Sequence, residues 1–325
     1  MCLYSIQTQH PLQNATLLSL PFSAMPPSPF HVFASTLRAA PAIRTAFVRE
    51  LPSISGSATE ATAFRRRARA GEWHTQNAGQ APGHVHANLV LLPQRNAFDF
   101  LRFCLANPRP CPLLAVTAPG DPCAHGVAPG SDLRTDCPRY GVYRGGKLVD
   151  TPTEVRELYD GEMRGDAVGF LLGCSFTWER ELAEAGLEPR HITQGTNVPM
   201  FRTNVRNNRS GPFGGDMVVS MRPFASTKDC ERAAAITGRY PGAHGAPVHW
   251  GDPGVLGIDD LSHPDWGDAV NVGPDEVPCF WACGVTPQTA LMEAKLPLAI
   301  THAPGHMFIT DLMDCDLLAS GFDVN

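Results

Sequence analysis

Apolar residues gather in short runs that alternate with stretches of helical character along most of the chain. Runs at 87–92, 110–116, 167–174, 217–221, 277–283, 298–301 and 307–311 have the length and composition of buried strands. Helical spacing or capping signals predict helices over 60–70, 98–105, 153–159, 176–185, 227–237 and 286–295. In the helix over 98–105, Phe98, Leu101 and Leu105 are expected on the buried face. Strand–helix–strand alternation predicts a mixed α/β fold with parallel strand pairs.

The pattern of apolar and polar residues differs between residues 117 and 224 from that in the rest of the chain. A β-hairpin is expected over 139–149, where Gly145 and Gly146 supply a tight turn, and the strands around it are short. We therefore expect two lobes. Residues 57–116 and 225–325 would form a discontinuous main domain, an α/β layered sandwich, and residues 117–224 a smaller α+β two-layer domain.

The first 56 residues differ from the rest. Residues 1–49 contain no Asp or Glu but do contain Arg38, Arg44 and Arg49. An acid-free, Arg-bearing and Ser-containing leader is typical of an organellar transit peptide. A disordered extension or a start codon assigned too far upstream is the alternative. We expect a weakly ordered segment outside the functional core, with a cytoplasmic location, or the mitochondrial matrix if the segment is a transit peptide.

Composition narrows the classes of function. The net charge is −6 and only 18% of the 325 residues are charged, which disfavours binding to nucleic acid or to an anionic membrane surface. The longest clearly apolar run, 167–174, is too short to cross a bilayer. None of the ten cysteines forms a C-x-x-C pair, so reduced and mostly buried thiols are expected.

Two strand-to-helix junctions carry candidate chemistry. In Phe280-Trp-Ala-Cys-Gly-Val-Thr-Pro-Gln288, an apolar strand ends at Cys283 and Gly284, and Thr286 is the expected helix cap. Free N–H groups at such a helix start bind anions. At the other junction, Cys174 and Ser175 suit a nucleophile or an oxyanion donor, although no G-x-S-x-G elbow is present. An ordinary capped helix and a small-residue turn with a buried thiol are the structural alternatives.

Histidines cluster on Gly- and Pro-rich loops. His302 and His306 flank a Pro-Gly turn, which forbids the helix on which a four-residue spacing would bind zinc, but two imidazoles can serve as acid and base. His244 and His249 lie on another such loop with Asp252. With Asp311 these histidines could form a three-histidine and carboxylate metal site, but no pair has diagnostic spacing, and we expect no metal.

Arginines on or beside strands suggest carboxylate binding. Arg202, close to Asn204, and Arg222 can each offer a guanidinium fork to a substrate carboxylate. The loop over 131–136 carries Asp132, Arg134 and Asp136. It is interpreted as an internal salt-bridged loop, with binding of a substrate ammonium as the alternative.

Taken together, these segments resemble the D-glutamate cyclase family, whose members are often labelled "putative hydro-lyase". The similarity extends from residue 60 to 311, in the same order. It is carried by residues 87–90, 110–114, 131–136, 170–176, 197–204, 219–223, 244–249, 280–288 and 300–311. The resemblance implies a two-lobed mixed α/β fold, conversion of D-glutamate to 5-oxo-D-proline and water, and no obligate cofactor.

Chemistry then assigns roles to the candidate residues. Forming a lactam requires deprotonation of the amine, stabilisation of an oxyanion and loss of water. The catalytic candidates are His302, His306, Asp311, Cys174 and Cys283. The substrate-binding candidates are Ser175, Arg202, Asn204, Arg222, His244, His249, Gly284, Thr286 and Gln288.

The expected partner is a small carboxylate or amino-acid substrate, with a homo-oligomer left open. A hydro-lyase for another small carboxylic acid, or a non-catalytic carboxylate-binding protein, is the alternative function.

Overall fold

Strand β1 (His84–Pro93) is buried along its whole length and organises the larger of two sheets. The computed structural model describes residues 59–318, so the leader expected over 1–56 lies outside the described residues. In the larger sheet the order is β2–β5–β1–β10–β3–β4, with β11 also paired to β1. The other strands of this sheet are β2 (Leu113–Val116), β3 (Tyr140–Arg144), β4 (Lys147–Asp150), β5 (Ala167–Gly173), β10 (Ala299–His302) and β11 (Phe308–Met313).

The smaller sheet comes from the middle of the chain. It has the order β6–β7–β9–β8 and comprises β6 (Met200–Arg206), β7 (Asp216–Phe224), β8 (His249–Trp250) and β9 (Val277–Ala282). Residues 84–173 and 299–313 thus supply the strands of one sheet, and residues 200–282 those of the other. The described residues belong to one compact unit, and the domain boundaries expected at 116 and 224 stay a prediction.

The mixed α/β class is confirmed, but the expected parallel pairing is wrong. Every ladder between named strands is antiparallel, including those on both sides of β1. The alternation of strands and helices predicted parallel pairs because short βαβ crossovers bring strands back in the same direction. Here strands that are distant in sequence pair instead, such as β1 with β5 and β10, and the local pattern does not determine their direction.

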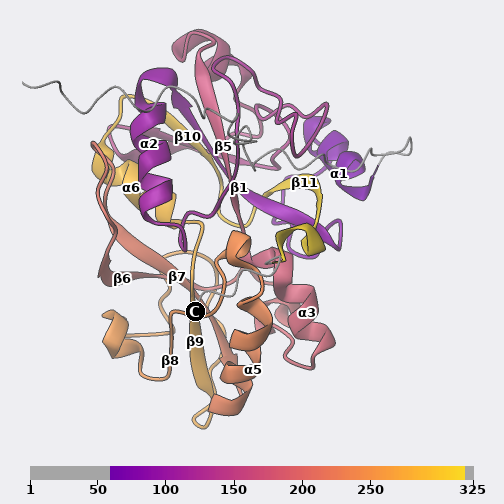
Figure 1. Ribbon diagram of the computed structural model, residues 1–325, viewed down its shortest axis with the longest axis vertical. Helices are drawn as coiled ribbons and strands as arrows, with labels where there is room; N and C mark the ends of the chain where they lie inside the picture. Colours follow the sequence, from indigo (N-terminus) through magenta and orange to yellow (C-terminus); the bar gives the residue numbers. More distant parts are fainter. Residues whose placement is uncertain (1–58, 319–325) are drawn as a thin grey trace, which may run out of the picture. The chain divides into compact units, whose positions relative to one another are not determined.

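Helices pack on the larger sheet and beside the smaller one (Figure 1). Their bounds are α1 (Glu60–Arg69), α2 (Gln94–Ala106), α3 (Glu179–Glu184), α4 (Arg190–Gln194), α5 (Thr227–Thr237) and α6 (Thr286–Ala294). Phe100 and Phe103 of α2 and Leu291 of α6 share one apolar cluster with alternate residues of β1 and β5. The opposite face of β1 packs against loops from residues 124–163.

Helix α2 buries a different face from the one expected, although Leu101 of the expected face is half-buried against the same apolar cluster. Phe98 and Leu105 are 70% and 65% exposed, whereas Phe100, Phe103 and Cys104 are fully buried. Both sets have helical spacing, and packing of Phe100 against Phe170 and Phe213 decides between them.

Local capping also differs from expectation. Ser226 caps α5, which begins at Thr227, and the helix expected over 153–159 is replaced by a short π-helical turn at Leu158–Glu162. Helix α6 is preceded by Val285 as its cap residue, so Thr286 is its first residue. The expected helix over 176–185 consists of a 3₁₀ turn, η2 (Ser175–Trp178), followed by α3.

Along one edge of β1, a gap separates two partner strands, and this gap is next to the candidate site. Strand β10 pairs with β1 at Val90 and Leu91, and β11 pairs with it at His86 and Ala87. The chain turns away from β1 between these two ladders, so the backbone of Leu89 has no strand partner on that side. A buried backbone N–H needs a hydrogen-bond acceptor, and a side chain has to supply it.

Between residues 59 and 318, every helix is too short or too polar to cross a membrane.

Candidate active site

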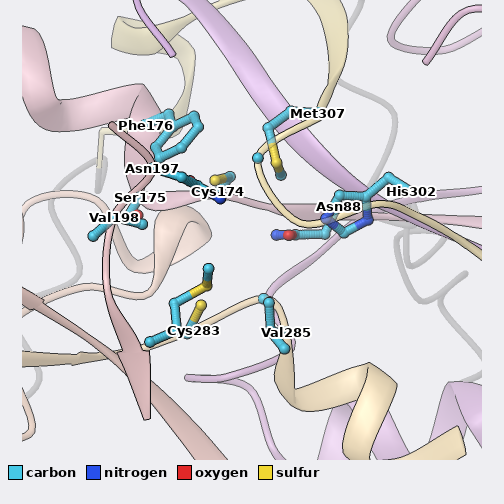
Figure 2. Close-up of a pocket in the computed structure, with 13 residues that line it drawn as sticks. Asn88, Cys174, Ser175, Phe176, Asn197, Val198, Cys283, Val285, His302 and Met307 are labelled. Atoms are coloured by element: carbon cyan, nitrogen blue, oxygen red, sulfur yellow. The ribbon is translucent and has the colours of Figure 1, made fainter. Parts of the chain in front are cut away.

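A pocket lies where β1, the ends of β5, β9 and β10, and the segment before β6 meet (Figure 2). We call it the inner pocket, and about 310 Å³ of space between its atoms, part of which is open to solvent, is unfilled. It is lined by Asn88, Cys174, Ser175, Phe176, Asn197, Val198, Met200, Cys283, Gly284, Val285, His302, Gly305 and Met307. None of these residues carries a formal charge at neutral pH. Both predicted strand-to-helix junctions therefore open into one uncharged pocket.

His302 fills the gap in the edge of β1. Its Nδ1 lies 3.1 Å from the amide nitrogen of Leu89 and 3.3 Å from the carbonyl oxygen of the same residue. Its Nε2 is buried and has no hydrogen-bond partner among the described residues. Burial lowers the pKa of His302 to about 4, so the ring is neutral near pH 7. A neutral imidazole thus reaches the pocket with one ring nitrogen still available.

Two thiols lie at the junctions. Burial raises the pKa of Cys174 to about 12 and that of Cys283 to about 11, so both are protonated near neutral pH. Backbone N–H groups of Gly284 and Val285 point toward the sulfur of Cys283 and oppose that rise. These N–H groups precede the first turn of α6, where the helix dipole favours a negative charge.

Two asparagines shape the pocket by packing on glycines. The Nδ2 of Asn88 donates to the carbonyl of Gly173 over 2.8 Å, and a Cβ added to Gly284 would lie only 1.9 Å from that Nδ2. A Cβ added to Gly305 would lie 2.7 Å from Nδ2 of Asn197. The Oδ1 of Asn197 is buried without a partner among the described residues. Only glycine at these two positions allows the carboxamides to come so close.

A buried ion pair lies behind Ser175. Arg222 and Glu179 are 1% and 4% exposed and are hydrogen-bonded to each other. Nη2 of Arg222 also donates to Oγ of Ser175 over 3.0 Å, and its guanidinium lies 4.7 Å from the ring centre of Trp178. Burial alone would raise the pKa of Glu179, but His191 and Arg222 lower it to about 2. Because Ser175 accepts from Arg222, its own hydroxyl proton is free to point into the pocket.

The structure thus brings together five of the predicted site residues: Cys174, Ser175, Cys283, Gly284 and His302. Arg222 reaches the pocket only through Ser175. It is not free to bind a carboxylate, since Glu179 already occupies its guanidinium.

The remaining predicted residues have other contacts. Arg202 lies over Trp266 beside a separate surface pocket, and Asn204 contacts the carbonyl of Val255. Nδ1 of His244 is 2.8 Å from the carbonyl of Arg109, and His249 stacks on Phe280. Thr286 accepts from the amide of Val218, and Gln288 accepts from the hydroxyl of Tyr143.

His306 and Asp311 also lie away from the lining of the inner pocket. Nδ1 of His306 is 2.9 Å from the carbonyl of Pro304, and the carboxylate of Asp311 pairs with Arg65 at 2.8 Å. Within residues 59–318, no group of three or more His, Cys, Asp or Glu side chains is arranged to hold a metal ion. In the 131–136 loop, Arg134 pairs with Asp132, as expected for an internal salt-bridged loop.

Four polar residues in or behind the pocket were not predicted from the sequence: Asn88, Asn197, Glu179 and His191. Asn88 gave a usable signal, since a polar residue inside an otherwise apolar strand needs a buried partner. Glu179 and His191 gave none, because each lies on an ordinary short helix and becomes informative only when β7 brings Arg222 beside them.

Comparison with known proteins places this architecture in a family. A family model described as D-glutamate cyclase matches residues 168–311. A "Putative hydro-lyase" of Rubrobacter xylanophilus is 56% identical over 252 residues, which cover 78% of this chain and 95% of that protein. The chain belongs to the D-glutamate cyclase family.

Other members of the D-glutamate cyclase family are comparably similar. A "Putative hydro-lyase" of Bordetella pertussis is 52% identical over 87% of this chain and 99% of its own length. One from Geobacillus kaustophilus is 53% identical over 77% of this chain and 93% of its own length. Every residue lining the inner pocket except Asn88 falls inside the segment matched by the D-glutamate cyclase model.

Proposed function

We propose that this protein is a hydro-lyase that converts D-glutamate to 5-oxo-D-proline and water in the inner pocket. The observation that carries the proposal is the unpartnered Nε2 of a neutral His302 in a pocket lined without formal charges. Membership of the D-glutamate cyclase family supports the choice of reaction.

An uncharged pocket favours the reactive forms of glutamate. In water the α-amine is an ammonium and the γ-carboxyl is a carboxylate, and neither form reacts with the other. Desolvation penalises both charges, so moving one proton from the ammonium to the γ-carboxylate becomes less costly. That transfer gives an amine nucleophile and a carboxylic acid, which are the partners that lactam formation needs.

His302 is placed to carry protons in both directions. When Nε2 is the acceptor, Nδ1 carries a proton and can donate it to the carbonyl of Leu89. When Nε2 is the donor, Nδ1 accepts from the amide of Leu89. After Nε2 has taken the proton from the amine, the imidazolium still donates its Nδ1–H to the carbonyl of Leu89, so this residue supports the ring before and after proton uptake.

Transfer of one proton by His302 accounts for both bond changes in the covalent step. The amine nitrogen attacks the carbon of the γ-carboxyl group to form the C–N bond, and His302 takes the proton that the nitrogen loses. In the tetrahedral intermediate a negative charge develops on oxygen. Backbone N–H groups of Gly284 and Val285 and the hydroxyl of Ser175 are the donors that would stabilise it. His302 then returns the proton to the leaving hydroxyl, the C–O bond breaks, and water departs.

Arg222 has an indirect role in this scheme. Its hydrogen bond fixes the oxygen of Ser175, while Glu179 balances its charge. We therefore treat Arg222 as a positioning residue for the oxyanion donor. Because the reacting groups belong to one molecule, holding glutamate curled supplies a further advantage of up to about 7–11 kcal/mol.

Incubation of the purified full chain with D-glutamate, L-glutamate and 5-oxo-D-proline tests the proposal. Chiral chromatography should show 5-oxo-D-proline formed from D-glutamate and none of its enantiomer from L-glutamate. Binding of D-glutamate without turnover would point to a carboxylate-binding protein instead. Failure to bind or convert either glutamate would overturn the proposed substrate.

A further inference from the structure

A second pocket adjoins the inner pocket and shares one wall with it. This outer pocket has about 680 Å³ of unfilled space, part of which is open to solvent. It is lined by His84, His86, Phe176, Thr177, Glu188 and Ile192 among others. Phe176 lines both pockets. Its neighbours along η2 divide between them, since Ser175 lines the inner pocket and Thr177 the outer one. The Phe176 side chain is therefore the partition between two spaces.

The Phe176 side chain packs against an apolar cluster that includes Val198, Met200 and Val285, and it also contacts two imidazole rings. The ring of Phe176 lies edge-on to His86 at 6.0 Å and stacks on His191 at 6.2 Å, and the residue is only half-buried. Contacts of this kind contribute about 0.5–1.5 kcal/mol each. Rotation of the ring would break these contacts, but it would leave the hydrogen bonds of the surrounding sheet intact.

A polar path follows β1 across the partition. His84, His86 and Asn88 occupy alternate positions of a buried strand, and the first two line the outer pocket whereas Asn88 lines the inner one. Nε2 of His86 lies 2.9 Å from the carbonyl of Gln80, which can only accept, so Nδ1 is left as an acceptor. Neither that Nδ1 nor the hydroxyl of Thr177 has a partner among the described residues. Such acceptors suit the ammonium group of an amino acid.

We propose that the outer pocket is the entry vestibule through which an amino-acid substrate reaches the inner pocket, with the Phe176 side chain as the gate between them. The identity of the amino acid rests on the proposed function. The route itself does not, because it can be measured with a reagent that is not a substrate.

The two buried thiols of the inner pocket report on the gate. Cys174 and Cys283 should react slowly with iodoacetamide in the folded full-length protein, and peptide mass spectrometry gives the rate for each. Phe176→Ala should raise both rates by about tenfold or more, since a closed gate limits access. Ile192→Ala is the matched control, because Ile192 lines the outer pocket alone, and it should leave both rates unchanged. Cys111, which is fully buried and lines neither pocket, reports global opening.

An occluding variant tests the route independently. Ala183→Trp fills the outer pocket from α3 and should slow alkylation of both thiols. Unchanged rates in this variant would show that reagents enter elsewhere and would overturn the proposal. A rise in Phe176→Ala that Cys111 shares would reflect loosened packing. In that case Phe176→Trp, which keeps the partition, decides the matter: slower alkylation than in the wild type supports the gate, and an unchanged rate contradicts it.

Steady-state kinetics test whether the amino acid passes through the outer pocket. Thr177→Val removes the hydroxyl of the outer pocket without touching the partition, and should raise KM for D-glutamate several-fold with little change in kcat. An unchanged KM would remove the outer pocket from the path of the amino acid. If the protein does not turn over D-glutamate at all, the proposed function fails, while the alkylation rates still test the gate.

Discussion

Nδ1 of His302 lies within hydrogen-bonding distance of both the amide nitrogen and the carbonyl oxygen of Leu89, at 3.1 and 3.3 Å. This arrangement exists because β10 leaves β1 before Leu89 and β11 rejoins it only beyond Asn88. The backbone of Leu89 needs a hydrogen-bond partner at this unpaired strand edge, and His302 supplies it. Leu89 can bond to either neutral tautomer of that imidazole. Its other nitrogen reaches the inner pocket.

Substitution of His302 should therefore abolish most of the activity. We expect His302→Gln to lower kcat by about 10²–10⁴, the usual contribution of a positioned acid or base. His306→Ala is the matched control, because His306 does not line the pocket, and its effect should stay below about tenfold. Steady-state kinetics and circular dichroism on both variants provide the test. Equal losses in the two variants would show that His302 has no special role.

The pH dependence of stability should report the buried histidines. Burial lowers the pKa values of His86, His244 and His302 from 6.5 to about 4. Between these pH values the unfolded chain binds more protons than the folded protein, so the free energy of unfolding rises with pH. Acidification from pH 6.5 to 4 should lower it by about 3 kcal/mol or more.

Urea unfolding across this pH range measures the effect. The triple variant with Gln at the three histidine positions should show a much flatter dependence between pH 6.5 and 4. The same slope in that variant and in the wild type would assign the effect to other groups. Glu179, whose folded pKa is about 2, should add its own loss only as the pH falls below about 4.5.

The Arg222–Glu179 pair should matter more for stability than any surface pair. Glu179→Gln leaves the buried guanidinium of Arg222 without its counter-charge, and we expect a loss of about 3–5 kcal/mol. Glu184→Gln is the control, since Glu184 pairs with Arg180 on the surface and should contribute about 0–1 kcal/mol. Chemical denaturation of both variants compares them directly, and similar midpoints would contradict this account of the pair.

The sequence alone predicted the strand-to-helix junctions more reliably than the packing around them. The junctions at Cys174 and Cys283 and the turn after His302 could be predicted, because small residues and helix starts leave local signals. The parallel pairing and the buried face of α2 could not be predicted correctly, since both depend on contacts between distant segments. Phe98 and Phe100 are equally plausible core residues until Phe170 and Phe213 are placed beside one of them.

In the candidate site, too, local sequence signals identify some residues, whereas contacts between distant segments determine the partners of those residues. Arg222 could be predicted from the sequence as a candidate carboxylate-binding arginine, but its partner in the structure is Glu179, which is 43 residues away in sequence. Its expected contact with a carboxylate is real, but the carboxylate belongs to the protein. Asn88 and Leu89 become part of the site only through the split between β10 and β11, which no local pattern reveals.

The thiols should prove dispensable for a covalent step. With pKa values of about 12 and 11, Cys174 and Cys283 are protonated near neutral pH and are poor nucleophiles. Cys174→Ala and Cys283→Ala should each retain activity within about tenfold of the wild type. Mass spectrometry of the protein during turnover should detect no acyl adduct. Loss of all activity in either variant, together with such an adduct, would replace direct attack by a thioester route.

The most direct test follows the new bond itself. D-Glutamate labelled with ¹⁵N in the amine and ¹³C in the γ-carboxyl group is incubated with the full-length protein and observed by NMR. The account predicts a one-bond ¹⁵N–¹³C coupling that grows with time, is absent with labelled L-glutamate, and is nearly abolished by His302→Gln. Consumption of D-glutamate without that coupling, or equal coupling in the wild type and His302→Gln, would contradict it.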